Sequence, residues 1–292
     1  MEQQSTRIPS EYPMPQRLII IGDIHGDMAV TLKCLSKAGV INSRNQWIGG
    51  NTVVVQMGDQ VDRGGRTAME YDEDSDLPIM VYLNRLHLDA IRYGGAVFSL
   101  IGNHEIMNTM GIFDYVSPKG FEMYGGRRGR QDAFAPGSDI AKMMAHTRFA
   151  ALKIGDCLFV HGGVRDRLLE RYNIDTVNDL MRRNLLKRLE QREASQFREL
   201  FMNDNSLLWN RAQSSEPMNR QQTDQLKRTL RRWGVNYLFV GHTPQDNGIN
   251  SDADYRVWRV DSGMSKAFGS TGKVQVLEIR QENQQKRFII RR

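Results

Sequence analysis

Aspartate, histidine and asparagine residues stand beside glycines in several segments of the 292-residue sequence. In the first of these segments an aspartate and a histidine are two residues apart, at Asp23 and His25. Glycine lets the chain turn sharply and approach a bound ion or phosphate without a Cβ in the way. The segments are Gly22-Asp23-Ile24-His25-Gly26-Asp27, Gly58-Asp59-Gln60-Val61-Asp62-Arg63-Gly64, Gly102-Asn103-His104-Glu105, His161-Gly162-Gly163 and Gly241-His242-Thr243.

These segments offer oxygen and imidazole donors, which suit divalent cations such as manganese, iron and zinc. No cysteine accompanies them, which argues against a structural zinc site. The two cysteines, Cys34 and Cys157, lie in apolar segments and are expected to be buried thiols. Any one of the segments could be an ordinary polar turn. Taken together and in this order, they predict a site for two metal ions.

Each segment follows a short run of apolar, β-branched or aromatic residues. Such continuous runs are typical of strands covered on both faces, and the functional loops of such sheets gather at the carboxyl ends of the strands. Alternate residues of an extended chain point the same way, so Asp23 and His25 are expected to face one site. The predicted strands span 18–21, 52–55, 96–101, 158–160 and 237–240.

Helical patterns lie between the strands and complete an α/β arrangement. Asp27 is a candidate N-cap for a helix over 28–38, and a second helix is expected over 77–93. A charged helical stretch over 176–201 indicates a helical insertion at about 165–220, and a further helix is expected over 223–233. Strands are expected again over 255–260 and 274–279. We expect a flexible N-terminal arm over 1–16 and a single domain over 17–292.

The net charge of +6 does not by itself indicate a nucleic-acid-binding protein. Part of the excess alternates with glutamates at helical spacing over 182–193, which is typical of a solvated helix face, and part lies in a C-terminal tail. Nucleic acid is therefore not the expected partner. No apolar stretch approaches the ~18 residues that span a bilayer, and no signal or transit peptide is visible, so we expect a cytoplasmic protein without membrane contact.

The segments together resemble the calcineurin-like metallophosphoesterases, and specifically their phosphoprotein phosphatase branch. The continuation Asp62-Arg63-Gly64 after Asp59 and the triplet Asn103-His104-Glu105 are typical of that branch. The sequence is most similar to the Shewanella-like protein phosphatases. The similar segments are Ser99-Leu100-Ile101, Met107-Asn108, His161-Gly162-Gly163, Asp261-Ser262-Gly263-Met264-Ser265 and Phe268-Gly269.

This resemblance implies a fold of two packed mixed β-sheets flanked by helices, an α-β-β-α sandwich, with a dinuclear metal site at the carboxyl ends of the strands. It implies one metal ion held by Asp23, His25 and Asp59. It implies a second ion held by Asp59, Asn103, His161 and His242, so that Asp59 bridges the pair. Two such ions lower the pKa of a bridging water and orient in-line attack by hydroxide on the phosphoryl group.

The resemblance also assigns the remaining catalytic groups. His104 would protonate the leaving oxygen, and Asp62 would hold its imidazole in the required tautomer. Arg63 would bind the phosphate through its planar guanidinium, and Arg211, which follows Leu208-Trp209-Asn210, would be a second phosphate-binding arginine. Eukaryotic members of the branch have an arginine immediately before the Gly-Asn-His-Glu turn, where this sequence has Ile101.

The expected activity is metal-dependent hydrolysis of phosphomonoesters on proteins, at serine/threonine or tyrosine, with a phosphoprotein or phosphopeptide as the partner. This is the activity of a metallophosphatase of the protein-serine/threonine-phosphatase type. The same metal site would also suit a diadenosine tetraphosphate hydrolase-type pyrophosphatase or a nucleic-acid phosphodiesterase. A catalytically silent binding module is a third alternative, disfavoured because buried Asp and His groups without a cation are unfavourable. The sequence does not identify a regulatory subunit.

Overall fold

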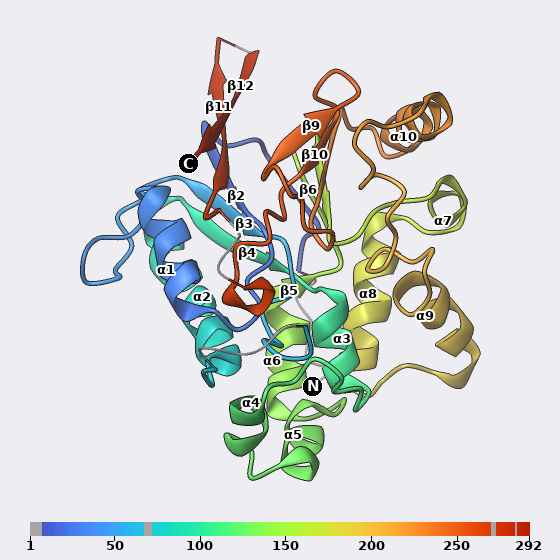
Figure 1. The fold of residues 1–292 in the computed structure, drawn as a ribbon. Coiled ribbons are helices and arrows are strands. Elements are labelled where there is room, and N and C mark those ends of the chain that lie inside the picture. Colours follow the sequence, from blue (N-terminus) through green and yellow to red (C-terminus); the bar gives the residue numbers. More distant parts are fainter. Residues whose placement is uncertain (1–7, 67–71, 270–272, 284) are drawn as a thin grey trace, which may run out of the picture.

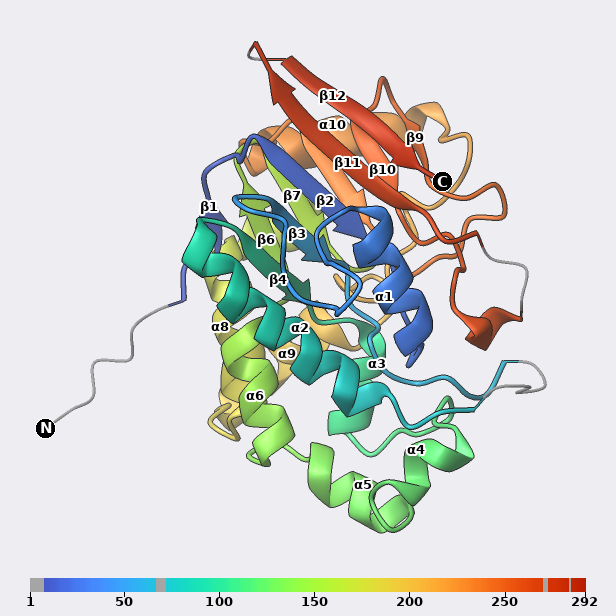
Figure 2. The ribbon, with the colours of Figure 1, turned by 90° about the vertical axis from the view of Figure 1, so that its left-hand side faces the viewer.

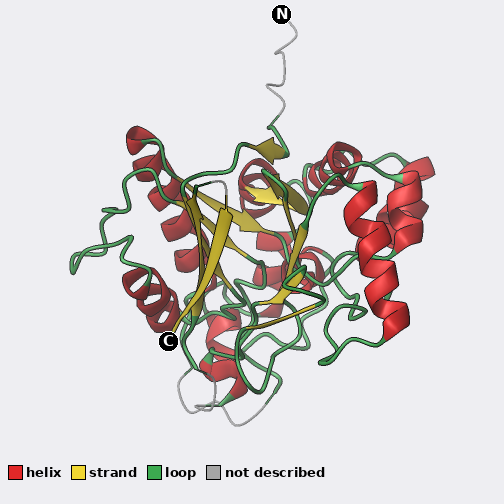
Figure 3. Cartoon of the chain, turned by 90° about the horizontal axis from the view of Figure 1, so that it is seen from above, coloured by secondary structure: helices red, strands yellow, loops and turns green. Residues whose placement is uncertain are grey.

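The computed structural model describes residues 8–66, 72–269, 273–283 and 285–292. Two six-stranded β-sheets lie face to face in this part of the chain, and helices cover the outer face of each sheet (Figures 1 and 3). The predicted α/β sandwich of two mixed sheets is therefore confirmed. Among the described residues, no helix is both long and apolar enough to cross a membrane.

The first sheet contains the strands that precede Asp23, Asp59 and Asn103. Its strands β2, β3, β4 and β5 are parallel, so their carboxyl ends lie at one edge of the sheet. Beyond β2, the sheet continues with β11, which is antiparallel to β2, and with β12, which is antiparallel to β11. In spatial order the strands are β12 (Gln285–Arg291), β11 (Val276–Glu282), β2 (Arg17–Ile21), β3 (Val53–Gln56), β4 (Ala96–Leu100) and β5 (Arg148–Phe149).

The second sheet contains the strands that precede His161 and His242. Here β7, β8 and β10 are parallel, whereas β6 and β9 are antiparallel to their neighbours β7 and β10. In spatial order the strands are β1 (Glu11–Tyr12), β6 (Ala151–Ile154), β7 (Cys157–Val160), β8 (Tyr237–Val240), β10 (Val257–Arg259) and β9 (Asn250–Asp252).

Side-chain alternation along the strands divides the core into layers. On β2, Leu18 and Ile20 point toward the second sheet, whereas Ile19 and Ile21 point toward the helices. The helices α1 (Met28–Lys37) and α2 (Asp76–Ala90) pack on that outer face, and Figure 2 shows both in front of the sheet. A strand with apolar residues on both faces must be covered twice, which explains its continuous apolar run.

The outer face of the second sheet packs against the helices that follow β4 and β7. The core there joins Leu158 and Leu238 to residues of α6, α8, α9 and α10. The remaining helical elements are α3 (Asn103–Thr109), α4 (Pro118–Glu122), α5 (Arg127–Phe134), α6 (Asp139–Thr147), α7 (Asp166–Arg171), α8 (Ile174–Leu185), α9 (Ala194–Phe201), α10 (Arg220–Arg232), η1 (Ile91–Tyr93), η2 (Gln191–Glu193) and η3 (Lys266–Phe268).

Four local predictions differ from the structure. The expected single helix over 176–201 is broken into α8, η2 and α9, and Lys187 has a left-handed backbone (φ 57°) in the break. The last helix begins at Arg220 after the Asn219 N-cap, three residues before the expected start. The expected C-terminal tail forms β12 on β11. Within the expected N-terminal arm, residues 1–7 lie outside the described residues, and Glu11–Tyr12 form a strand on β6, with Tyr12 packed against Phe98 at 4.5 Å between ring centroids.

Candidate metal centre

The register of the two sheets brings the glycine-flanked segments to one edge. Ile21, Gln56 and Ser99, near the ends of β2, β3 and β4, lie side by side in the first sheet. In the second sheet the adjacent parallel strands β7 and β8 end at Val160 and Val240. The residues that follow the five strands therefore meet where the carboxyl ends of both sheets converge.

Three of the predicted ligands have left-handed backbone conformations, which are uncommon for residues other than glycine. The φ values are 47° for His25, 49° for Asp59 and 65° for His242. The buried carboxylate of Glu105 supports the turn at Asp59, because it accepts hydrogen bonds from the amides of Asp59 (3.0 Å), Gln60 (2.7 Å) and Gly102 (2.7 Å). Backbone strain of this kind persists only where surrounding contacts hold it, and it is common at functional sites.

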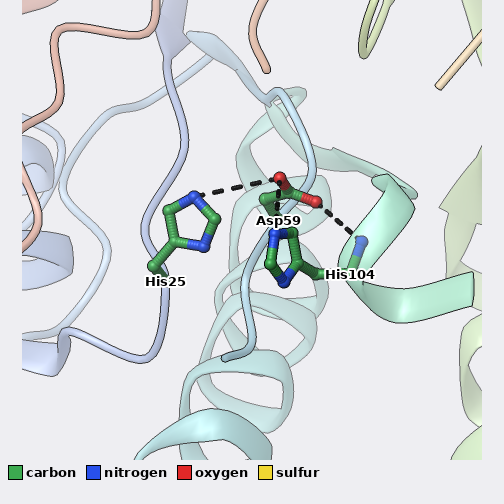
Figure 4. A group of neighbouring side chains, drawn as sticks. All are labelled: His25, Asp59 and His104. Atoms are coloured by element: carbon green, nitrogen blue, oxygen red, sulfur yellow. Dashed lines mark hydrogen bonds and ion pairs between the residues drawn. The ribbon is translucent and has the colours of Figure 1, made fainter. Parts of the chain in front are cut away.

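The carboxylate of Asp59 lies at the centre of the cluster. Its Oδ2 is 3.2 Å from His161 Nε2 and 3.8 Å from His25 Nε2. His161 Nε2 is also 3.0 Å from Asn103 Oδ1, and its Nδ1 faces the carbonyl oxygen of Met57 at 2.8 Å. In Figure 4 the rings of His25 and His104 both approach the Asp59 carboxylate. Asp59 is thus placed between histidines from separate strand ends.

Asp23 and His242 complete the cluster and carry polar atoms without partners. Asp23 Oδ2 accepts a hydrogen bond from the His242 amide at 2.9 Å. Asp23 Oδ1 and His242 Nε2 are buried and have no hydrogen-bond partner within the described chain. Buried polar atoms are nearly always partnered, and a cation would satisfy both atoms. A side chain in place of Gly241 would collide with the Asp23 carboxylate, so glycine is required there.

The charges of the cluster are strongly perturbed. Burial raises the pKa of Asp23 well above its usual value. Although burial disfavours the charged imidazole, the Asp59 and Asp23 carboxylates raise the pKa of His161 to about 10. Burial, with the positive groups His161 and Arg211 nearby, lowers the pKa of His242 to about 3. Metal ligands must be deprotonated, so a bound cation would replace the His161 proton and compensate the buried carboxylates.

Two triplets of donor atoms are compatible with a cation, namely His25, Asp59 and His104, and Asp59, His161 and His242. Asp59 belongs to both, which fits a carboxylate shared by two ions. Asn103 adds an amide oxygen beside His161. The donor set therefore fits two divalent cations held by oxygen and nitrogen ligands.

His104 lies beside this cluster with its other nitrogen held by a carboxylate. Its Nδ1 is 2.9 Å from Asp62 Oδ2, and its Nε2 is 3.9 Å from Asp59 Oδ2. Asp62 in turn accepts hydrogen bonds from Asn108 Nδ2 at 2.9 Å and from Arg130 Nη2 at 3.1 Å. A carboxylate on Nδ1 favours the tautomer in which Nδ1 carries a proton. The other nitrogen, Nε2, then faces the Asp59 cluster.

Arg130 is a buried residue beside the site whose position the sequence did not reveal. It is fully buried and also donates to Asp76 Oδ2 (2.7 Å), Asn108 Oδ1 (2.7 Å) and the carbonyl oxygen of Gly120 (2.9 Å). It lies among other arginines at the start of α5, and such a cluster is usually solvated. Only the packing of α5 under the site distinguishes Arg130 from its exposed neighbours.

The two predicted phosphate-binding arginines lie in different surroundings. Arg63 is only 3% exposed, and its guanidinium donates to the Gly26 carbonyl oxygen (3.0 Å) and to Glu73 (2.7 Å), with Asp27 at 3.5 Å. Arg211 is exposed, and its positive charge contributes to the lowered pKa of His242 after burial and His161. Arg63 is therefore engaged by protein acceptors, whereas Arg211 lies on the open side of the site.

A third arginine, Arg66, contacts His25 and His104 directly. Its Nη2 is 3.0 Å from His104 Nε2 and 3.2 Å from His25 Nδ1. The sequence gives no motif that singles it out. The available signal was its position three residues after Arg63, in the loop that carries Asp59 and Asp62.

Residues 16–246 match the family described as calcineurin-like phosphoesterase. The chain belongs to this family. Shewanella-like protein phosphatase 2 of Arabidopsis thaliana is 31% identical over 323 residues, covering 96% of this chain and 79% of that protein. Shewanella-like protein phosphatase 1 of Plasmodium berghei is 29% identical over 255 residues, covering 85% of this chain and 67% of that protein.

Solved structures show the same fold. The cold-active protein-tyrosine phosphatase of a psychrophilic Shewanella species has a TM-score of 0.78 at 24% identity, covering 98% of this chain and 83% of that chain. A protein serine/threonine phosphatase of Saccharomyces cerevisiae has a TM-score of 0.61 at 17% identity, covering 97% of this chain and 83% of that chain. The predicted family is confirmed. The chain is a calcineurin-like metallophosphoesterase similar to Shewanella-like protein phosphatases.

Proposed function

We propose that this phosphoesterase is a protein phosphatase that hydrolyses phosphomonoesters on serine/threonine or tyrosine. The observation that carries the proposal is the pairing of His104 with Asp62 beside the Asp59 cluster. A phosphomonoester needs a proton on its leaving oxygen, and a histidine oriented by a carboxylate can supply one. The names of the relatives, which are protein phosphatases, support a protein substrate.

Two divalent cations, manganese, iron or zinc, would be held at the strand ends. Asp23, His25 and Asp59 would hold one, and Asp59, Asn103, His161 and His242 would hold the other. When bound, such a pair acts as a Lewis acid that lowers the pKa of water and polarises the phosphoryl oxygens. The unpartnered atoms of Asp23 and His242 support this assignment.

The side chains of this protein then supply proton transfer and phosphate binding. His104 protonates the leaving oxygen through Nε2 while Asp62 accepts the hydrogen bond from Nδ1. Arg130 and Asn108 hold the Asp62 carboxylate in place by donating hydrogen bonds to it. Arg211 is proposed as a phosphate-binding residue on the open side. Arg63 is proposed to bind phosphate as well, which requires its guanidinium to exchange a contact with Glu73 or Asp27 for the substrate.

The experiment that tests the proposal compares His104→Asn with wild type after both are loaded with manganese, iron or zinc. We expect turnover of phosphopeptides to fall by ~10²–10⁴-fold, the usual contribution of a general acid, while the metal content stays the same. His146→Asn is the matched control, because His146 is an exposed histidine in the last turn of α6 and is not one of the residues assigned to the site.

The substrate panel contains phosphoserine, phosphothreonine and phosphotyrosine peptides, a diadenosine polyphosphate and single-stranded DNA. Preferential turnover of the phosphopeptides supports the proposal. Faster turnover of the dinucleotide or the DNA would replace it with a pyrophosphatase or a phosphodiesterase. Unchanged phosphopeptide turnover in His104→Asn would remove the role assigned to that histidine.

A further inference from the structure

The guanidinium of Arg66 is held in a fixed position beside the proposed active site. Two aromatic rings lie against it, with Tyr115 at 4.9 Å and Phe268 at 4.8 Å from the guanidinium carbon to the ring centroids. Its Nη1 donates to the carbonyl oxygens of Asp62 (3.1 Å) and Gly64 (3.3 Å). The side chain is only partly buried. Stacking between two rings fixes the plane of a guanidinium but leaves its edge available.

The other edge of the guanidinium points at two imidazoles. Arg66 Nη2 is 3.0 Å from His104 Nε2 and 3.2 Å from His25 Nδ1. A guanidinium has donors and no acceptor, so a hydrogen bond to either nitrogen requires that nitrogen to be unprotonated. Nη2 is the donor of this side chain that faces the proposed active site.

The two imidazole nitrogens also border the proposed metal site. His25 Nδ1 faces the Val61 carbonyl oxygen at 3.3 Å, and the other nitrogen of this ring is 3.8 Å from Asp59 Oδ2. His104 Nε2 is 3.9 Å from the same Asp59 oxygen. The Nη2 edge of Arg66 is therefore directed into the space beside His104 Nε2 and the Asp59 carboxylate.

We infer that Arg66 binds a phosphoryl oxygen of the substrate through Nη2. The required ligand is an anionic acceptor beside His104 Nε2, where the leaving group must also lie, and a phosphate supplies both oxygens at once. An anion also relieves the repulsion between a guanidinium and side chains that would hold two cations. Arg63 contacts Gly26 and Glu73, whereas Arg66 contacts His104. The inference rests on the proposed function, because it uses His104 as the proton donor.

The test measures binding of inorganic phosphate to the metal-loaded protein by calorimetry, without turnover. We expect Arg66→Ala to raise the phosphate dissociation constant by about 10–100-fold, the range for loss of a charge-assisted hydrogen bond. Arg66→Lys should fall between this variant and wild type, since an ammonium keeps the charge but not the planar donor edge. Arg44→Ala is the matched control, an exposed arginine on the loop after α1.

Thermal unfolding and metal content are recorded for each variant to exclude a purely structural effect. Tyr115→Leu and Phe268→Leu should weaken phosphate binding by a smaller factor, because they loosen Arg66 without removing it. Unchanged phosphate affinity in both Arg66 variants, at wild-type metal content, would overturn the inference. If Arg66→Ala loses phosphate affinity but wild type hydrolyses no phosphopeptide, Arg66 still binds phosphate and only the proposed function fails.

Discussion

Two buried carboxylates on neighbouring strands of the first sheet have opposite surroundings. Asp23 follows β2, and one of its oxygens has no partner among the described residues. Glu278 lies on β11 opposite Ile19 of β2, and its two oxygens contact the Nε atoms of Arg17 (2.8 Å), Arg280 (2.7 Å) and Arg291. Burial raises the pKa of Asp23, whereas the three arginines outweigh burial at Glu278 and lower its pKa to about 2.

The difference suits Glu278 to stabilising the fold and Asp23 to binding a cation. A buried charge is tolerated when protein groups compensate it, and Glu278 meets that condition. Among the described residues, Asp23 has only the His242 amide as a hydrogen-bond donor, with the His161 imidazole nearby, and a bound cation would compensate its ionised form. The comparison predicts that the two residues can be removed with opposite effects on activity and stability.

The largest expected effect is on activity at Asp23. Asp23→Asn should reduce phosphatase turnover by more than about 10³-fold, because loss of a ligand removes several kcal/mol of Lewis-acid stabilisation. The free energy of unfolding of the metal-free protein should not fall, since the substitution removes an unfavourable buried charge. Turnover, metal content and urea unfolding measure the effects, with the exposed Asp204→Asn as control. A variant that keeps its metal and its turnover would break the comparison.

Arg130 should affect both properties, because it compensates Asp76 and also Asp62, the carboxylate that contacts His104. Arg130→Met leaves Asp62 and Asp76 buried without their guanidinium partner, and removal of one member of a buried ion pair destabilises by about 3–5 kcal/mol. Turnover should also fall, since Asp62 loses a hydrogen bond. Arg128→Met, on the exposed side of α5, is the control. Equal urea midpoints for the two variants would show that Arg130 has no such role.

The smallest expected effect is the loss of stability at Glu278, and it depends on pH. The folded-state pKa of about 2 lies below the ordinary value of 4.5, so the stabilisation is present above about pH 4.5 and is lost as the pH falls toward 2. Its arginine partners are partly exposed, so we expect Glu278→Gln to cost about 1–2 kcal/mol at neutral pH.

Urea unfolding of Glu278→Gln and wild type from pH 7 to pH 2 measures this contribution. The two curves should converge at acid pH, while turnover and metal content at neutral pH remain those of wild type. A constant difference between the curves over that range would contradict the assigned ionisation of Glu278.

The sequence by itself determined the strand ends and the residues that follow them. Asp23, Asp59 and Asn103 come directly after short apolar runs, and parallel pairing places the ends of such runs side by side. The sequence also indicated Asp27 as a candidate N-cap, and its side chain accepts a hydrogen bond from the Val30 amide at 3.0 Å. These features depend on local spacing and on sheet register, which the chain encodes over a few residues.

Only the tertiary structure decided how the long charged side chains are used. Arg63, Arg66 and Arg130 look alike in the sequence, yet one contacts Glu73, one lies between Tyr115 and Phe268, and one is buried against Asp62 and Asp76. An arginine side chain has many rotatable bonds, and its position is set by acceptors and rings that come from distant segments. The partners of each arginine were therefore decided by tertiary packing. The positions of the carboxylates were decided by the ends of the strands that precede them.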